Sequence, residues 1–227
     1  MNTEISSYLA VFSHELKSPL NSIINLAKLM ELKIEDSDET KLKSYISSIL
    51  SSALYLKTFI NNTIELGRIN QGINEIYLEE FNIVEILYEI VDLTKIMVEE
   101  KPVEVKFHFP QKKINIVSDP VKVKQILLNI ASNAAKFTKK GVILFLISKV
   151  KKGVLISIKD TGCGIKEENL RKIFNPYCNL GENIYESSGL GLYITKNLLS
   201  ILEGDMSIKS EYNKGTEVEI FIPSKKQ

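Results

Sequence analysis

Residues 119–136 read DPVKVKQILLNIASNAAK, and this stretch decides how the larger part of the chain is interpreted. Asp119 is a residue type that caps helix N-termini, and Pro120 suits the first helical position. A helix is therefore predicted to begin here and to run to Lys136.

Three polar side chains share one face of this predicted helix. Asn129, Asn133 and Lys136 are four and three positions apart, and residues so spaced are neighbours on a helix surface. If that face is buried against a sheet, its amides need partners. Mg²⁺ with phosphates can supply them, and Lys136 can reach a phosphate as a point charge. The alternative is a solvated face, but Asn is a poor helix former, so two of them here favour the binding face.

Helical and strand patterns alternate through the rest of the C-terminal part of the chain. The predicted helices cover residues 83–98, 119–136 and 190–202, and the predicted strands cover residues 103–109, 142–150, 154–159, 206–210 and 217–222. Gly204 is expected to end the last helix, and residues 213–215 to form the turn of a closing hairpin. The pattern predicts an α+β domain of roughly 150 residues.

Residues 1–71 contain one Pro and one Gly and carry two apolar seams whose members are alternately three and four positions apart. The seams comprise Leu9, Phe12, Leu16, Pro19, Ile23, Leu26 and Met30, then Leu42, Ile46, Ile49, Ala53, Leu56, Ile60, Thr63 and Gly67. The polar residues 35–38 between them predict the turn of a helical hairpin. One hairpin buries little area, so two copies are expected to form a four-helix bundle in a homodimer; the alternative is a hairpin packed on its own chain.

His14 is expected to project away from the first seam, toward solvent. Neutral imidazole is a good nucleophile near pH 7, Glu15 can accept or orient the ring proton, and Ser18 lies one turn further on the same face. The alternative is an ordinary surface histidine. Pro19 favours a functional reading, because a proline inside a helix is costly. The second histidine, His108, is given no role.

Two glycine-containing motifs follow predicted strands or precede a predicted helix. Asp160 ends a strand and can accept a hydrogen bond from an exocyclic amine such as that of adenine, while Gly162 and Gly164 allow a tight turn and close approach of a ligand. Residues 189–192 open a helix, where backbone N–H groups and the helix dipole suit a phosphate. Each motif alone is a weak signal.

The composition excludes several classes of protein. Lys and Arg number 29 against 28 Asp and Glu, without the basic surplus of a protein that binds nucleic acid. The longest apolar run, residues 142–147, is too short to cross a bilayer. Cys163 and Cys178 provide neither a disulfide framework nor metal-ligand spacing. A cytoplasmic chain without membrane contact of its own is expected, either free or as the cytosolic part of a larger membrane-tethered or multidomain protein.

Taken in order, five sequence boxes resemble those of the sensor histidine kinases of bacterial two-component systems, over nearly the whole chain. They are the phosphoacceptor box HELKSPLN at residues 14–21, the N box at 129–138, the first glycine box at 160–165, the F box at 173–177 and the second glycine box at 189–192. The resemblance implies a dimerisation and phosphotransfer hairpin of the HisKA type at 1–71, a linker at 72–76 and a Bergerat (GHKL) ATP-binding domain of mixed sheet and helices at 77–227.

The resemblance also implies the reaction. Such a protein uses ATP to phosphorylate His14 within a homodimer, and then passes the phosphoryl group to an aspartate of a response regulator receiver domain. Phosphatase activity toward the regulator is a further reaction of such proteins. Glu15 and Ser18 would assist at the hairpin, and the cofactors are ATP and Mg²⁺.

The remaining site residues are carried over from the family motifs. Asn133 is expected to coordinate Mg²⁺, Asn129 to lie beside the phosphates, Lys136 to contact them and Asp160 to bind the adenine amine. The other nucleotide-binding residues implied by the boxes are Gly162, Gly164, Phe174, Gly189, Leu190, Gly191 and Leu192. Related chaperone and gyrase ATPases have a Glu where Asn129 stands. An amide cannot act as a general base, so attack by water is expected to be suppressed.

Two departures from the family pattern keep alternatives open. Ser187 stands where a Gly is usual, and the segment 178–188 that would cover the nucleotide has no Lys or Arg. A scaffold or phosphatase with little kinase activity is therefore one alternative, and a chaperone-like ATPase is another, disfavoured by Asn129 and the His14 hairpin. Ser18, Asn21 and Asn25 follow His14 at spacings of four, three and four and are expected to continue its exposed stripe, on which a response regulator would dock. The ATP-binding domain is expected to approach mainly from the other end of the hairpin.

Overall fold

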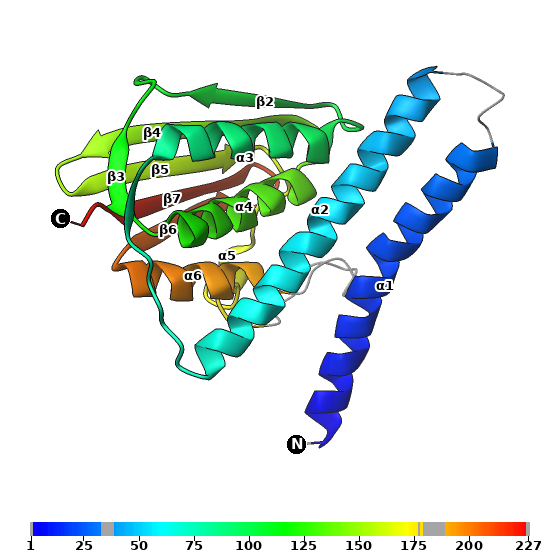
Figure 1. The fold of residues 1–227 in the computed structure, drawn as a ribbon, viewed down its shortest axis with the longest axis horizontal. Coiled ribbons are helices and arrows are strands. Elements are labelled where there is room, and N and C mark those ends of the chain that lie inside the picture. Colours follow the sequence, from blue (N-terminus) through cyan, green and yellow to red (C-terminus); the bar gives the residue numbers. More distant parts are fainter. Residues whose placement is uncertain (1, 33–38, 177, 179–188, 226–227) are drawn as a thin grey trace.

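Two long helices precede a domain of helices packed on a sheet (Figure 1). The structure, a computed structural model, describes residues 2–32, 39–176, 178 and 189–225, with the side chains of these residues except 2–12, 14, 32 and 40. The elements are α1 Asn2–Leu32, α2 Glu39–Asn70, β1 Glu79–Asn82, α3 Ile83–Val98, β2 Val103–His108, β3 Asn115–Ser118, α4 Pro120–Phe137, β4 Gly141–Val150, β5 Gly153–Asp160, α5 Glu167–Leu170, α6 Gly191–Leu202, β6 Asp205–Glu211 and β7 Gly215–Pro223.

Helices α1 and α2 form the predicted hairpin, and α2 also packs on α3, α4 and α6 (Figure 1). Pro19 of the first seam is buried, and four further members, Leu16, Ile23, Leu26 and Met30, are half-buried. The second seam is less covered: Leu42 and Ile60 are 44% and 43% exposed. The face of α2 that is buried contains Phe59 and Leu66 instead. Packing of the hairpin on its own chain is thus realised along one side of α2, while an apolar side stays exposed.

The C-terminal domain is built on a five-stranded sheet in the order β2-β4-β5-β7-β6. The β2–β4 pair is parallel and the other pairs are antiparallel, so the sheet is mixed, as predicted. Helices α3, α4 and α6 cover one face of the sheet (Figure 1), and the core lies between them around Leu87, Leu127 and Phe145. The sequence did not predict β1, β3 or the short α5, because their runs of four residues are too short to show a period.

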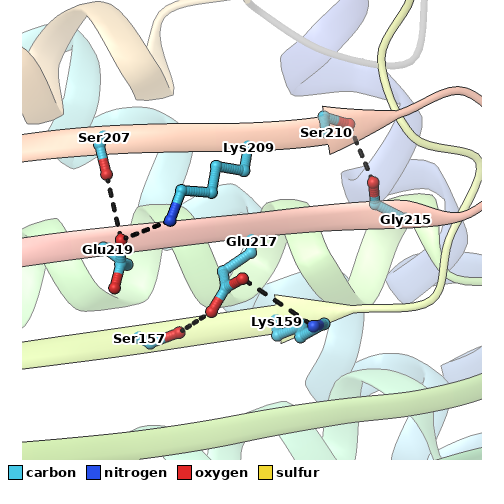
Figure 2. A network of polar contacts seen from close by, with 8 residues as sticks. All are labelled: Ser157, Lys159, Ser207, Lys209, Ser210, Gly215, Glu217 and Glu219. Atoms are coloured by element: carbon cyan, nitrogen blue, oxygen red, sulfur yellow. Dashed lines mark hydrogen bonds and ion pairs between the residues drawn. The ribbon is translucent and has the colours of Figure 1, made fainter.

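On the face of the sheet opposite the helices, polar side chains of β5, β6 and β7 bond to one another. On β5 and β7, Ser157 donates to Glu217 at 3.0 Å, and Lys159 pairs with the same carboxylate at 3.9 Å (Figure 2). On β6, Lys209 lies 3.4 Å from Glu219 of β7. Alternation of these polar residues with the apolar ones that face the helices sets the register of the C-terminal strands.

Local signals account for the helix boundaries. Asp119 caps α4, accepting hydrogen bonds from the backbone N–H groups of Val121 at 3.1 Å and Lys122 at 3.0 Å, and this confirms the prediction. Helix α6 ends at Leu202, as predicted, but the prediction that Gly204 terminates it was wrong. Glu203, with φ of 60°, takes the left-handed conformation. Gly204 is needed for a different reason: a Cβ there would lie 2.5 Å from the carbonyl oxygen of Phe221 on β7.

Between α2 and β1 the chain contains no helix or strand, and residues 73–78 are exposed. The proposed linker at 72–76 lies at the start of this stretch, where Gly72 has φ of +69°. Along the described ranges of the chain, no helix combines the length and the hydropathy that crossing a membrane requires.

Candidate active site

Asn129 lies at the centre of the helical layer and connects three helices. It is buried on α4, and its Nδ2 donates to the carbonyl oxygen of Gly191 and to Oγ1 of Thr195, both at 3.4 Å, on α6. Its Oδ1 accepts a hydrogen bond of 3.0 Å from Nδ2 of Asn62 on α2. The predicted polar face of α4 therefore points toward α6 and the hairpin, and it is not a solvated face.

Asn133 lies one turn further along α4, is half-buried, and faces the start of α6 together with Asn129. A Cβ added at Gly191 would be 3.8 Å from Nδ2 of Asn133 and 4.0 Å from the side chain of Asn129. The first turn of α6 is thus close to both amides. Leu190, the N-cap residue of α6, has no polar side chain with which to cap the first N–H groups. A helix N-terminus of this kind attracts anions.

Lys136 is half-buried near the end of α4, and its Nζ lies 5.8 Å from the ring centroid of Tyr55 on α2 and 5.6 Å from that of Phe137. Both distances are in the range of cation–π attraction. The side chain therefore lies on the same polar face as Asn129 and Asn133, as the spacing predicted, but in this arrangement it is directed toward the hairpin.

Asp160, at the end of β5, is 8% exposed. Its Oδ1 accepts a hydrogen bond of 2.8 Å from the backbone N–H of Gly162. Burial raises the pKa of the Asp160 carboxyl above its ordinary value, and backbone hydrogen bonds from Gly162 and Thr216 oppose that effect. A desolvated carboxyl with spare acceptor capacity suits a ligand that brings its own N–H donor.

The loop after Asp160 is closed against the end of α4. The backbone N–H of Cys163 donates to the carbonyl oxygen of Phe137 at 3.2 Å, and Gly164 has φ of +62°, a conformation that favours glycine. The first glycine box and the N box, distant in sequence, are therefore joined by a hydrogen bond. Phe174 of the F box is half-buried under Nζ of Lys196 on α6, 5.2 Å from its ring centroid.

The second glycine box contributes the start of α6. Gly189 has φ of +62° and Leu190 is 1% exposed. Leu192 is half-buried in the first turn. Of the segment 178–188 that is expected to cover the nucleotide, only Cys178 is within the described residues. Both departures from the family pattern, Ser187 and the segment without Lys or Arg, therefore lie outside the residues that the structure describes.

The hairpin residues fall on two sides of α1. The side chain of His14 is outside the described residues. Ser18 is exposed, as are Asn21 and Asn25, so the predicted stripe of polar residues is accessible. Glu15 was expected to act on the His14 ring; it is 2% exposed and accepts a hydrogen bond from the Tyr55 hydroxyl on α2.

Tyr55 of α2 contacts both Glu15 of α1 and Lys136 of α4, and so connects the first helix with the second domain. Burial raises the pKa of the Tyr55 hydroxyl far above its ordinary value, and the hydrogen bond to Glu15 adds to the effect. The phenol therefore stays protonated and remains a hydrogen-bond donor to Glu15. The other oxygen of Glu15, Oε1, is buried and has no hydrogen-bond partner within the described part of the chain.

The C-terminal domain contacts α2 both near Ser44 and near Asn62, so the expectation that it approaches the hairpin mainly from one end was wrong. Near the hairpin turn, Ser44 and Ser48 each donate to Glu100 at 2.7 Å, and Ser47 donates to Glu99. The two hydroxyls lower the pKa of the Glu100 carboxyl. Sequence spacing missed these contacts because they pair residues about 50 positions apart across a domain boundary.

Two family comparisons match separate parts of the chain. Residues 4–72 match the "His Kinase A (phospho-acceptor) domain", and residues 118–226 match the "Histidine kinase-, DNA gyrase B-, and HSP90-like ATPase". The first match covers the hairpin, and the second covers the C-terminal domain from Ser118 onward, so β1, α3 and β2 lie before it.

Curated relatives and solved structures give the same result. The chain is 33% identical to the autoinducer 2 sensor kinase/phosphatase LuxQ of Vibrio vulnificus, and the match covers 97% of this chain and 27% of LuxQ. It is 30% identical to hybrid signal transduction histidine kinase B of Dictyostelium discoideum, and that match covers 95% of this chain and 11% of that protein. A structure of full-length ShkA in complex with AMPPNP superimposes with a TM-score of 0.65 at 26% identity, covering 95% of this chain and 46% of that one.

The chain belongs to the sensor histidine kinases. It contains their phospho-acceptor hairpin and their ATP-binding domain, and it spans about a quarter or less of the two curated relatives named above.

Proposed function

We propose that this chain uses ATP and Mg²⁺ to phosphorylate its own His14, and then passes the phosphoryl group to an aspartate of a response regulator receiver domain. The observation that carries the proposal is the joint placement of Asn129, Asn133 and the first turn of α6 beside one another, with the Asp160 loop attached to the end of the same helix.

The residues fit ATP. Asp160 would accept from the amine of adenine, because its carboxyl is buried and keeps acceptor capacity beyond the two backbone bonds. The N–H groups at the start of α6 would bind phosphate oxygens, with Lys136 as a point charge. Asn133 offers an amide oxygen, a hard ligand of the kind Mg²⁺ takes together with phosphates and water.

The choice of His14 over water as the nucleophile follows from the chemistry of Asn129. An amide does not accept a proton at neutral pH, so this site has no general base at the position where related ATPases activate water. A nitrogen of His14 would attack the γ-phosphorus, a nitrogen–phosphorus bond would form, and the bond to the departing ADP oxygen would break. Glu15 follows His14 in the chain, and its Oε1, which has no hydrogen-bond partner among the described residues, would take the ring proton once the carboxyl turns toward His14.

The exposed apolar side of the hairpin supports a second copy of the chain as partner. On α1 it contains Leu20, Ile24 and Leu29, and on α2 it contains Leu42, Ile46, Leu50, Ile60 and Ile64. Two such sides packed together would form the four-helix bundle of a homodimer. Ser18, exposed one turn after His14, keeps a hydroxyl that could orient water, which supports phosphatase activity toward the regulator as a second reaction.

The test is incubation with γ-labelled ATP and Mg²⁺, scored for label that is lost in acid and kept in base. We expect label in the wild type and in His108→Gln, and none in His14→Gln, with the affinity for ADP unchanged in both variants. Label retained by His14→Gln would contradict the assignment of the nucleophile.

A further inference from the structure

The contact between the hairpin and the ATP-binding domain contains a pair of buried amides. Asn62 on α2 is 4% exposed and Asn129 on α4 is 2% exposed. Nδ2 of Asn62 donates to Oδ1 of Asn129 at 3.0 Å, and Oδ1 of Asn62 accepts from Nε2 of Gln125 at 3.3 Å. One side chain of the hairpin therefore bonds to two residues of the N-box helix.

These bonds bind the two domains in one arrangement, which we call the seated state. A buried amide costs free energy unless it is hydrogen-bonded, so Asn62 and Asn129 stabilise each other only while α2 and α4 are in contact. Neighbouring residues of α2 are also bound to the domain, through Tyr55 near Lys136 and Ser47 at Glu99.

In the seated state, both polar atoms of the Asn129 side chain are hydrogen-bonded within the protein. Its Oδ1 is bonded to Asn62, and its Nδ2 is bonded to Gly191 and Thr195. Helix α2 lies between α1, which contains His14, and the helices of the ATP-binding domain (Figure 1). Asn129 is thus turned toward α2, although the proposed function needs the same residue beside the phosphates.

We propose that Asn62 is a positioning residue that holds the ATP-binding domain on α2 and competes with nucleotide for Asn129. The proposal rests on the proposed function, because it assumes that Asn129 faces the nucleotide when one is bound. Nucleotide binding and seating then oppose each other, and each weakens the other by the same factor.

The consequence is measurable in the absence of any phosphoryl transfer. If only the unseated fraction binds nucleotide well, the apparent dissociation constant equals the intrinsic one divided by the unseated fraction. Loss of one interdomain hydrogen bond changes such an equilibrium by roughly fivefold. Loss of the Asn62–Asn129 hydrogen bond alone is therefore expected to strengthen binding of AMPPNP with Mg²⁺ by up to about fivefold.

The chain supplies its own matched control. Asn61 precedes Asn62 on the same helix and is exposed, so Asn61→Ala and Asn61→Asp make the same chemical changes outside the contact. Asn62→Ala removes both bonds. Asn62→Asp keeps the volume and the acceptor for Gln125, but it cannot donate to Asn129, so it tests the bond at issue even if the alanine variant folds poorly.

Two measurements on the full chain decide the matter: calorimetric titration with AMPPNP and Mg²⁺, and amide hydrogen exchange of α2 and α4 without nucleotide. We expect both Asn62 variants to bind more tightly and to exchange faster around residues 55–66 than the wild type, with both Asn61 variants unchanged. In the wild type, AMPPNP should accelerate exchange in the same segment.

Affinity in the Asn62 variants equal to that in the Asn61 variants, or weaker than in the wild type, would overturn the competition. Unchanged exchange in α2 would overturn the seating. These results are distinct from failure of the proposed function, which would appear as absent nucleotide binding in the wild type and all variants alike.

Discussion

Gly162 offers the sharpest test of how the Asp160 loop is built, because a single methyl group would meet two neighbours there. A Cβ at this position would overlap the carbonyl group of Phe137, with the carbonyl carbon 2.9 Å away, and would lie 2.8 Å from Oδ1 of Asp160. Both neighbours have a role: the Phe137 carbonyl accepts from Cys163, and the Asp160 carboxyl accepts from the Gly162 N–H itself.

The size of the effect follows from these distances. Non-bonded atoms pack at about 3.5 Å, so the Asp160 carboxyl has to withdraw by roughly 0.7 Å or the loop has to leave α4. Overpacking of this kind costs about 1–3 kcal/mol, and for a domain of this size Gly162→Ala should lower the melting temperature by roughly 2–12 °C. ADP affinity should fall as well, because the displaced carboxyl is the proposed adenine acceptor.

Gly67 provides a control with the opposite sign. It lies within α2, and a Cβ added there meets nothing within 4 Å. Since Ala favours a helix over Gly by about 0.5–1 kcal/mol, Gly67→Ala should leave stability unchanged or raise it. The assay is thermal unfolding by circular dichroism together with calorimetric titration of ADP. A Gly162→Ala protein that melts with the wild type and binds ADP equally well would refute the close packing of the loop on Phe137.

Three further predictions follow from the site and the hairpin. Asn133→Asp places an anion beside the phosphates and should abolish autophosphorylation in the labelling assay; a wild-type rate would exclude Asn133 from the metal shell. Burial raises the pKa of Asp160, so ionisation of this carboxyl lowers the stability of the wild type as pH rises from the ordinary value of 3.8 through the folded value. In denaturant titrations, Asp160→Asn should therefore become more stable relative to the wild type with increasing pH, and it should lose ADP binding. A difference in stability between the two proteins that does not depend on pH would contradict this. Asn21→Arg and Asn25→Arg, on the exposed stripe beyond His14, should slow transfer from pre-labelled kinase to a receiver domain without slowing autophosphorylation, and equal loss of both steps would rule out docking there.

Much of this fold was readable from the sequence because the signals are local. The helix at Pro120–Phe137 follows from an N-cap, a proline at the first position and a regular period, and the hairpin follows from seams that repeat over 30 residues. The three polar residues of the N-box helix share one face because the helical repeat requires it. The mixed sheet and the assignment to the sensor histidine kinases came from the order of the boxes.

The tertiary structure decided what those residues touch. Sequence spacing placed Glu15 beside His14, but packing turned its carboxyl toward Tyr55 of the other helix. Sequence spacing did not indicate a role for Asn62, because its hydrogen bond to Asn129 joins positions 67 residues apart. Such contacts depend on how two separately folded units meet, which is determined by the shape and burial of whole surfaces. A helical period specifies which side chains share a face, and only the packed domain specifies what that face meets.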